Sequence, residues 1–289
     1  MKHVGSFALV VGAVALLAIA PVTAAQPATG EIVVSNSGGF HGNAVVAMTR
    51  YGAITTILPL PAGAVGGTTV NHLGNEELIA VGTDIYGVNN GYVRRLAGSL
   101  PAGGRDVTVD EDNTWAVACG TVIYGINPVS STRTTIATGF VNATAIEWYG
   151  TDGSLLVIDT GADKIYKIPR GGSKQLLAAV AGAKCMAWDS YTGDVFVGAT
   201  NVLYRMSQSG GLTTVESNKP GLKNPTAMFL RSDRVLLVTQ GNTTPTGVYA
   251  YSGKSGLFMR PYYEATSATG LNPVGVTVDH FRDLWPLVT

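Results

Sequence analysis

Short apolar runs separated by glycine and small polar residues recur along the chain. The most distinct run is a tyrosine flanked by aliphatic residues, and successive copies of this tyrosine lie 38, 42, 38 and 45 residues apart. The copies are Tyr86, Tyr124, Tyr166, Tyr204 and Tyr249. A sixth run, at 45–48, keeps the pattern without tyrosine. Self-similarity at this period indicates a repeat architecture, and we interpret the tyrosines as packing between repeat units.

Each repeat contains four apolar runs, which predict four short strands. A run such as 155–158 precedes the tyrosine, an earlier run such as 107–110 ends in a polar turn, and a β-rich segment such as 212–215 follows. These runs suit strands, and no helical periodicity is present after residue 25. Four strands in about 40 residues form the blade of a β-propeller, so the predicted fold class is all-β. A two-layer sandwich would not explain a tyrosine at one recurring offset.

The spacing and the two chain ends predict six blades in a closed ring. The N-terminal unit supplies three strands (31–35, 44–48 and 53–58), and the C-terminus supplies one (273–279). Together they make one four-stranded blade, which removes exposed sheet edges at the junction. Residues 284–288 leave open a competing second strand or the start of a seventh blade.

The N-terminus predicts export. A basic start, an apolar stretch at 7–20 and small residues at Thr23 and Ala25 describe a secretory signal peptide. The stretch is shorter than the ~20 residues of a spanning helix. We therefore expect residues 1–25 to be a signal peptide and 26–289 a single propeller domain. The protein would be secreted or periplasmic, with no membrane span after cleavage.

Charge and cysteine content narrow the classes of partner. The chain has 19 basic and 19 acidic residues, so it lacks the basic surplus of a nucleic-acid binder. Cys119 and Cys185 fall two blades apart, and we expect them to be buried free thiols. We expect a monomer that does not bind nucleic acid.

One blade carries a specific motif: residues 145–168 contain an apolar first strand, then Asp-Thr-Gly at 159–161, then a strand that opens with Lys164 and Ile165. This blade resembles the NHL repeat. The blade entries Asn224-Pro225 and Asn272-Pro273 are similar to those of the family. The other blades match it in outline. Propellers of this kind include both scaffolds and enzymes, so the fold does not assign an activity.

Candidate site residues lie where the loops between second and third strands, and between blades, would surround the central channel. They are His41, Arg105, Asn142, Asp163, Asn224 and Asn272, with Asp84 and Asp159 on the same rim. The aspartates and asparagines have an alternative role as turn formers. Arg105 differs because most equivalent positions hold small or apolar residues. Carboxylates also recur at the turn between first and second strands, and we interpret them as blade geometry: Asp110, Asp152, Asp189 and Asp233.

These features favour an exported binding or scaffold propeller that presents its channel face to a protein, glycan or small molecule, without a cofactor. Enzyme activity stays open. One alternative is a calcium-dependent lactonase or esterase similar to gluconolactonase and strictosidine-synthase-like propellers, with oxygen ligands from Asn142, Asn224 and Asn272. No glutamate opens the first blade to complete that set. A third possibility, a lyase similar to virginiamycin-inactivating propellers, would need a histidine, for which His41 is the candidate.

Overall fold

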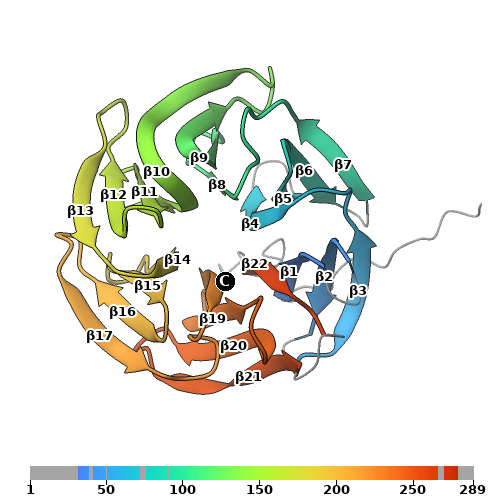
Figure 1. The fold of residues 1–289 in the computed structure, drawn as a ribbon, viewed down its shortest axis with the longest axis vertical. Helices are drawn as coiled ribbons and strands as arrows, with labels where there is room; N and C mark the ends of the chain where they lie inside the picture. The colour runs from blue at the N-terminus through green and yellow to red at the C-terminus, as the bar shows by residue number, and fades with distance from the viewer. Residues whose placement is uncertain are drawn as a thin grey trace, which may run out of the picture.

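The computed structural model describes residues 32–38, 42–49, 51–71, 76–89, 92–265 and 270–278. These ranges form 22 β-strands. Within them, no helix is long and apolar enough to cross a membrane. The sheets are arranged around a central axis, so the predicted β-propeller is confirmed (Figure 1).

Four of the sheets contain four antiparallel strands each, ordered from the axis outward. Their strands are β22 (Pro273–Val278), β1 (Ile32–Asn36), β2 (Ala44–Met48) and β3 (Ile54–Pro59); β4 (Val65–Asn71), β5 (Glu76–Val81), β6 (Asp84–Asn89) and β7 (Tyr92–Ala97); β14 (Ala183–Trp188), β15 (Val195–Ala199), β16 (Val202–Met206) and β17 (Leu212–Ser217); β18 (Pro225–Leu230), β19 (Val235–Gln240), β20 (Thr246–Ser252) and β21 (Phe258–Ala265).

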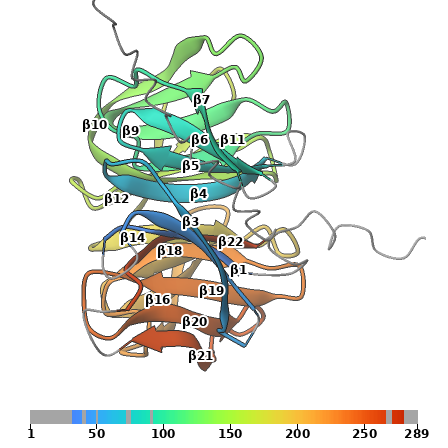
Figure 2. The same cartoon turned by 90° about the vertical axis from the view of Figure 1, so that its right-hand side faces the viewer.

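The first of these sheets joins the two ends of the described chain. Strand β22 pairs with β1 in antiparallel register, with Ile32 opposite Val278 and Val34 opposite Val276. The two strands lie side by side in both views of the ring (Figures 1 and 2). The prediction that the C-terminal segment completes the N-terminal blade is confirmed. Residues 284–288 lie outside the described residues, as does the 1–25 segment.

The fifth sheet has six strands. They are β8 (Asp106–Val109), β9 (Trp115–Ile126), β10 (Arg133–Tyr149), β11 (Ser154–Asp159), β12 (Lys164–Ile168) and β13 (Gln175–Ala179).

The two long strands of this sheet each serve two neighbours. Strand β9 pairs with β8 through 115–118 and with β10 mainly through 122–126. Strand β10 pairs with β9 through Arg133–Thr138 and at Ala143, and with β11 from Ala143 to Tyr149. The backbone is assigned as strand at 120–121 and 139–142, where the repeat predicts connections. The strands therefore form five hydrogen-bonded sheets, which corrects the prediction of six separate four-stranded blades.

Six hydrophobic clusters among the described residues hold the ring together, and each combines residues from successive repeat units. In one, Ile158 of β11 and Val197 of β15 are both fully buried. Tyr204 is partly buried against that cluster, and Tyr249 is fully buried in another. Burial of apolar surface between successive units is thus the main stabilising term of the ring. The recurring tyrosines pack there, as the sequence predicts.

Candidate functional site

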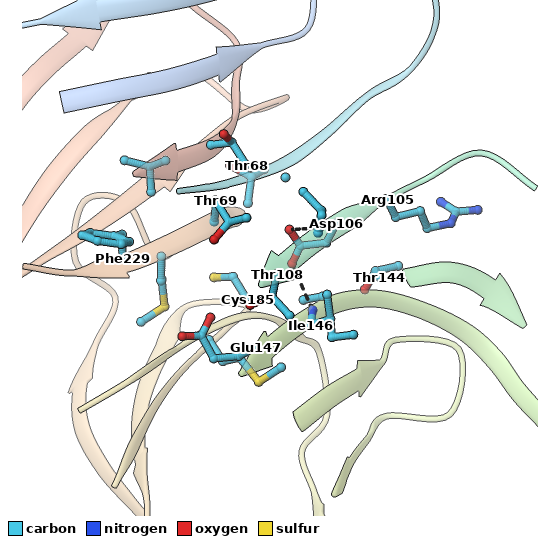
Figure 3. A pocket seen from close by; sticks show the side chains of 18 of the residues that line it. Thr68, Thr69, Arg105, Asp106, Thr108, Thr144, Ile146, Glu147, Cys185 and Phe229 are labelled. Carbon is cyan, nitrogen blue, oxygen red and sulfur yellow. Dashed lines mark hydrogen bonds between the residues drawn. The ribbon is translucent and has the colours of Figure 1, made fainter. Parts of the chain in front are cut away.

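A small cavity lies on the axis of the ring. Six strands line it: β4, β8, β10, β14, β18 and β22. Its volume is about 100 Å³, enough for a few water molecules. The polar groups that face it include threonine hydroxyls and the carboxyls of Asp106 and Glu147 (Figure 3).

Asp106 is the first residue of β8 and links two inner strands. Its Oδ1 accepts the backbone amide of Val107 at 2.9 Å, and its Oδ2 accepts the amide of Ile146 in β10 at 3.0 Å. A Cβ at Gly67 would lie 1.8 Å from Asp106 Oδ1, so glycine is required for this close approach. Burial raises the pKa of Asp106 to about 7, although the two amide bonds oppose the shift.

Glu147 lies in β10 and directly follows Ile146, whose backbone amide donates to Asp106. Burial, and to a smaller extent the negative charge of Asp106, raise the pKa of Glu147 to about 8, although a hydrogen bond from the Trp188 amide opposes the change. The two carboxyls therefore retain at least one proton between them at pH 7. Such a pair can donate and accept hydrogen bonds, or bind a cationic group with release of a proton.

Three repeat units share a polar arrangement at the rim, which we call the rim clamps. In each clamp, an acceptor side chain that ends the second strand accepts one or two backbone amides next to the start of the inner strand, which in β10 is the segment that pairs with β11. An asparagine before the first strand donates back to the residue that follows the second strand. The acceptor–asparagine pairs are Asp159 with Asn142, Gln240 with Asn224, and Asn36 with Asn272.

Most clamp hydrogen bonds are 2.6–3.1 Å long, and the longest, from the Asn224 amide to Gln240 Oε1, is 3.5 Å. Asp159 is 1% exposed and accepts the amides of Val141 at 2.8 Å and Asn142 at 2.7 Å. Asn224 Nδ2 donates to Gly241 O at 2.7 Å, and Asn272 Nδ2 donates to Ser37 O at 2.7 Å. Asn142 differs slightly, because its Nδ2 donates to the Thr160 hydroxyl at 3.0 Å. The clamps assign a structural role to three of the predicted site residues.

The remaining rim acids are also engaged. Asp163 accepts the Gly182 amide at 2.9 Å, and Asp84 pairs with Arg95 at 2.9 Å. The predicted turn role of the other carboxylates is confirmed, since Asp110 Oδ1 accepts the amides of Asp112 and Thr114. Equivalent bonds join Asp152 to Ser154, Asp189 to Tyr191 and Asp233 to Val235. His41 lies outside the described residues.

Arg105 has a different environment from the other rim candidates. It immediately precedes β8, lines the axial cavity and is exposed. Its backbone is fixed, since its amide donates to Ala118 O at 2.8 Å and its carbonyl accepts from Gly67. Its side chain points away from Asp106 (Figure 3). Within the described ranges its guanidinium has no ion-pair partner, so this cation is available at the channel mouth.

The asparagines do not fit a calcium site. Calcium needs several free oxygen ligands around one point. Asn224 Oδ1 already accepts a hydrogen bond from the Lys184 ammonium, and Asn272 Oδ1 accepts the Asn242 amide at 2.6 Å. Across the residues that the structure covers, no group of three or more His, Cys, Asp or Glu side chains could hold a metal ion.

Both cysteines are buried and free, as predicted. Cys185 lines the axial cavity, and burial raises its pKa well above the usual range. Burial also raises the pKa of Cys119 to about 11. Since the thiolate is the reactive form, neither thiol is a good nucleophile near neutral pH.

Sequence reasoning missed Asp106 and Glu147 as axial groups. Glu147 stands between Ile146 and Trp148, so strand alternation turns it away from the side chains of those two residues. A carboxyl inside an apolar first strand was therefore the available signal. Spacing alone did not indicate which face of that strand meets the axis.

No protein-family model and no curated protein sequence matches the chain. Solved structures match its shape. A chain from the nidogen/laminin complex gives a TM-score of 0.70 at 14% identity, over 86% of this chain and 98% of that chain. Virginiamycin B lyase from Staphylococcus aureus gives 0.56 at 15% identity, over 73% of each chain. A gluconolactonase from Xanthomonas campestris gives 0.61 at 16% identity, over 83% and 89%. At these identities the likeness shows that the chain has the β-propeller fold.

Proposed function

We propose that this protein is an exported binding propeller that holds a protein partner over its channel mouth. The observation that carries the proposal is Arg105, an exposed arginine beside the axial cavity with no ion-pair partner in the described part of the chain. The other predicted rim residues that the structure describes form hydrogen bonds within the protein. Arginine is enriched at interface hot spots because its planar group binds carboxylates in two-pronged geometry.

Cavity size favours a macromolecule over an enclosed small molecule. Pockets that enclose small ligands usually span about 300–1,000 Å³, whereas the axial cavity is about 100 Å³. A partner would therefore lie across the rim and insert at most a small group. The likeness to a chain from the nidogen/laminin complex offers a precedent for this fold within a protein complex.

Val141 provides an apolar contact on the same face. It is 63% exposed, and its backbone is held by the clamp through Asp159. An exposed apolar side chain on a fixed backbone loses little conformational entropy on binding. We expect the partner to present a carboxylate to Arg105 and an apolar group to Val141.

We also infer that the ring consists of six repeat units, two of which are joined through β9 and β10. Six inner strands line the axis, and six apolar clusters lie between successive units. Under this interpretation, the six-stranded sheet is two blades merged edge to edge. That the unit at 145–168 is an NHL repeat stays a hypothesis.

Site-specific photo-crosslinking tests the binding role. Benzoylphenylalanine replaces Val141 in one variant and Leu176, which is 58% exposed on β13, in the matched control. Culture fluid or extract of the source cells supplies the partner. We expect one discrete crosslinked species from position 141 that disappears with Arg105→Glu. Equal products from both positions would contradict the proposal.

A calcium-binding and turnover experiment tests the alternative that the protein is a calcium-dependent hydrolase. If calcium raised the melting temperature and Asn224→Ala removed that rise, the metal would bind the folded state through Asn224. Turnover of a lactone or ester panel together with that shift would replace the binding role with catalysis. We expect neither, because Asn224 Oδ1 already binds the Lys184 ammonium.

A further inference from the structure

A second, larger pocket opens between the two halves of the six-stranded sheet, and the proposed function does not use it. Its volume is about 460 Å³, within the range of small-ligand sites. It lies beside the β8–β9 and β12–β13 turns, at the opposite strand ends from the rim. We call it the turn-face pocket, defined by Asp110, Ile136, Trp148, Leu155, Ile168 and Arg170.

The pocket has an apolar interior. Leu155 is 7% exposed and Ile168 is 2% exposed, and the partly buried Ile136 and Trp148 pack against the same apolar cluster. Such an interior would remove the hydrocarbon part of a ligand from water, which favours binding.

The pocket-lining Gly153 has an aromatic ring and a neighbouring carboxylate close to it, those of Trp148 and Glu111. A Cβ placed on Gly153 would lie 3.4 Å from Trp148 Cη2 and 3.8 Å from Glu111 Oε1. Because Gly153 has no side chain, this space stays open between the ring and the acid. The φ of Gly153 is +69°, a value that other residues adopt at a cost, so the position favours glycine.

The charge around the opening is negative. Asp110 and Arg170 line the pocket, and Glu111 and Asp112, which pair with Arg170, add two more carboxylates beside it. Asp110 uses Oδ1 to hold the turn amides, and Arg170 pairs with Glu111 at 3.5 Å and with Asp112. These ion pairs are exposed, so they contribute little to stability and can rearrange. A planar cation from the chain itself already lies against these acids.

We propose that the turn-face pocket binds a small organic cation with an apolar body, such as a quaternary ammonium compound. The apolar interior would take the hydrocarbon groups, the Trp148 ring would contact the cation, and the acids would supply the opposite charge. Tryptophan is the strongest aromatic partner for such cations. The pocket volume and the aromatic wall carry the inference, and the surrounding acids set the sign of the ligand charge.

Choline and its neutral analogue 3,3-dimethylbutan-1-ol provide a matched pair of probes, because they differ in shape very little and in charge by one. Binding is followed through the Trp148 indole N–H signal in NMR titrations of the full chain. We expect choline to bind about 3- to 30-fold more tightly than the alcohol. Equal affinity, or no change of the Trp148 signal with either compound, would overturn the proposal.

Two variants separate the ligand site from folding. Asp110→Asn keeps an oxygen for the turn amides, and we expect it to weaken choline binding while leaving the alcohol unaffected. Arg170→Gln removes the competing cation at an exposed position, and we expect it to strengthen choline binding. Weaker choline binding in Arg170→Gln would contradict the charge argument even if Asp110→Asn failed to fold.

Discussion

The rim and the axial channel use polar side chains in opposite ways. At the rim, each clamp pairs an acceptor with backbone amides and an asparagine with a nearby acceptor, so these polar groups stabilise the fold. In the channel, Asp106 and Glu147 also bind backbone amides, but their burial raises both pKa values toward or above neutrality. The comparison teaches that hydrogen bonds to backbone amides do not by themselves make a buried polar group stabilising. In the channel, the cost of burying a charged carboxyl makes stability depend on pH.

The largest expected effect comes from breaking a buried clamp. Asp159→Ala would remove a carboxylate that is 1% exposed and would leave the amides of Val141 and Asn142 without this acceptor. We expect a loss of about 3–5 kcal/mol in the free energy of unfolding, measured by denaturant titration. Asp233→Ala is the control, because Asp233 is exposed and accepts one amide, and it should cost about 1 kcal/mol or less. Similar losses for both would remove the distinction between buried clamp and exposed turn.

The channel carboxyls should impose a pH dependence that the clamp asparagines cannot. The folded pKa of Glu147, about 8, exceeds its ordinary value of about 4.3. The folded state therefore binds the proton more tightly, and the free energy of unfolding falls as pH rises from about 4 to about 8. We expect Glu147→Gln to flatten this fall, so that from pH 5 to pH 8.5 the variant gains about 3–4 kcal/mol in free energy of unfolding relative to the original protein.

The control for that titration is Glu111→Gln, since the Glu111 side chain is 65% exposed. Its unfolding profile between pH 5 and 8.5 should run parallel to that of the original protein. If Glu147→Gln also ran parallel, the channel carboxyl would not be titrating in this range.

A smaller effect is expected where the ring closes. Asn272→Ala would remove bonds to Ser37 and Asn242, both near the β22–β1 junction. We expect a loss of about 1–2 kcal/mol in urea unfolding. Asn142→Ala removes one side-chain bond, to Thr160, and should cost less. The reverse order would contradict a special role for Asn272 in closure.

The sequence predicted the parts of the fold that repeat. The tyrosine period and the incomplete unit at each end indicated a closed propeller, because each repeat needs neighbours to bury its apolar faces. The six-stranded sheet was not predicted. Gly120 and Gly139 lie where the repeat predicts loops. Glycine is common both in loops and at bends of a continuous strand, so the residue type does not distinguish the two.

The roles of site residues were harder to predict than the fold, because the type of a residue does not indicate its hydrogen-bond partner. The side-chain amides of Asn142, Asn224 and Asn272 donate to Thr160, Gly241 and Ser37, and the residue type alone indicates none of these partners. Arg105 was singled out because its position usually holds a small or apolar residue. Asp106 and Glu147 were missed because the direction of a strand's faces depends on the assembled ring.

The central claim is that the clamps build the rim and that Arg105 at the channel mouth binds the partner. The most direct measurement is the yield of the crosslink from benzoylphenylalanine at position 141, compared between Arg105→Gln and Asn272→Ala under conditions where both are folded. We predict that Arg105→Gln abolishes the crosslink with unchanged stability, whereas Asn272→Ala preserves it. A crosslink that survives Arg105→Gln and is lost with a folded Asn272→Ala would contradict the account.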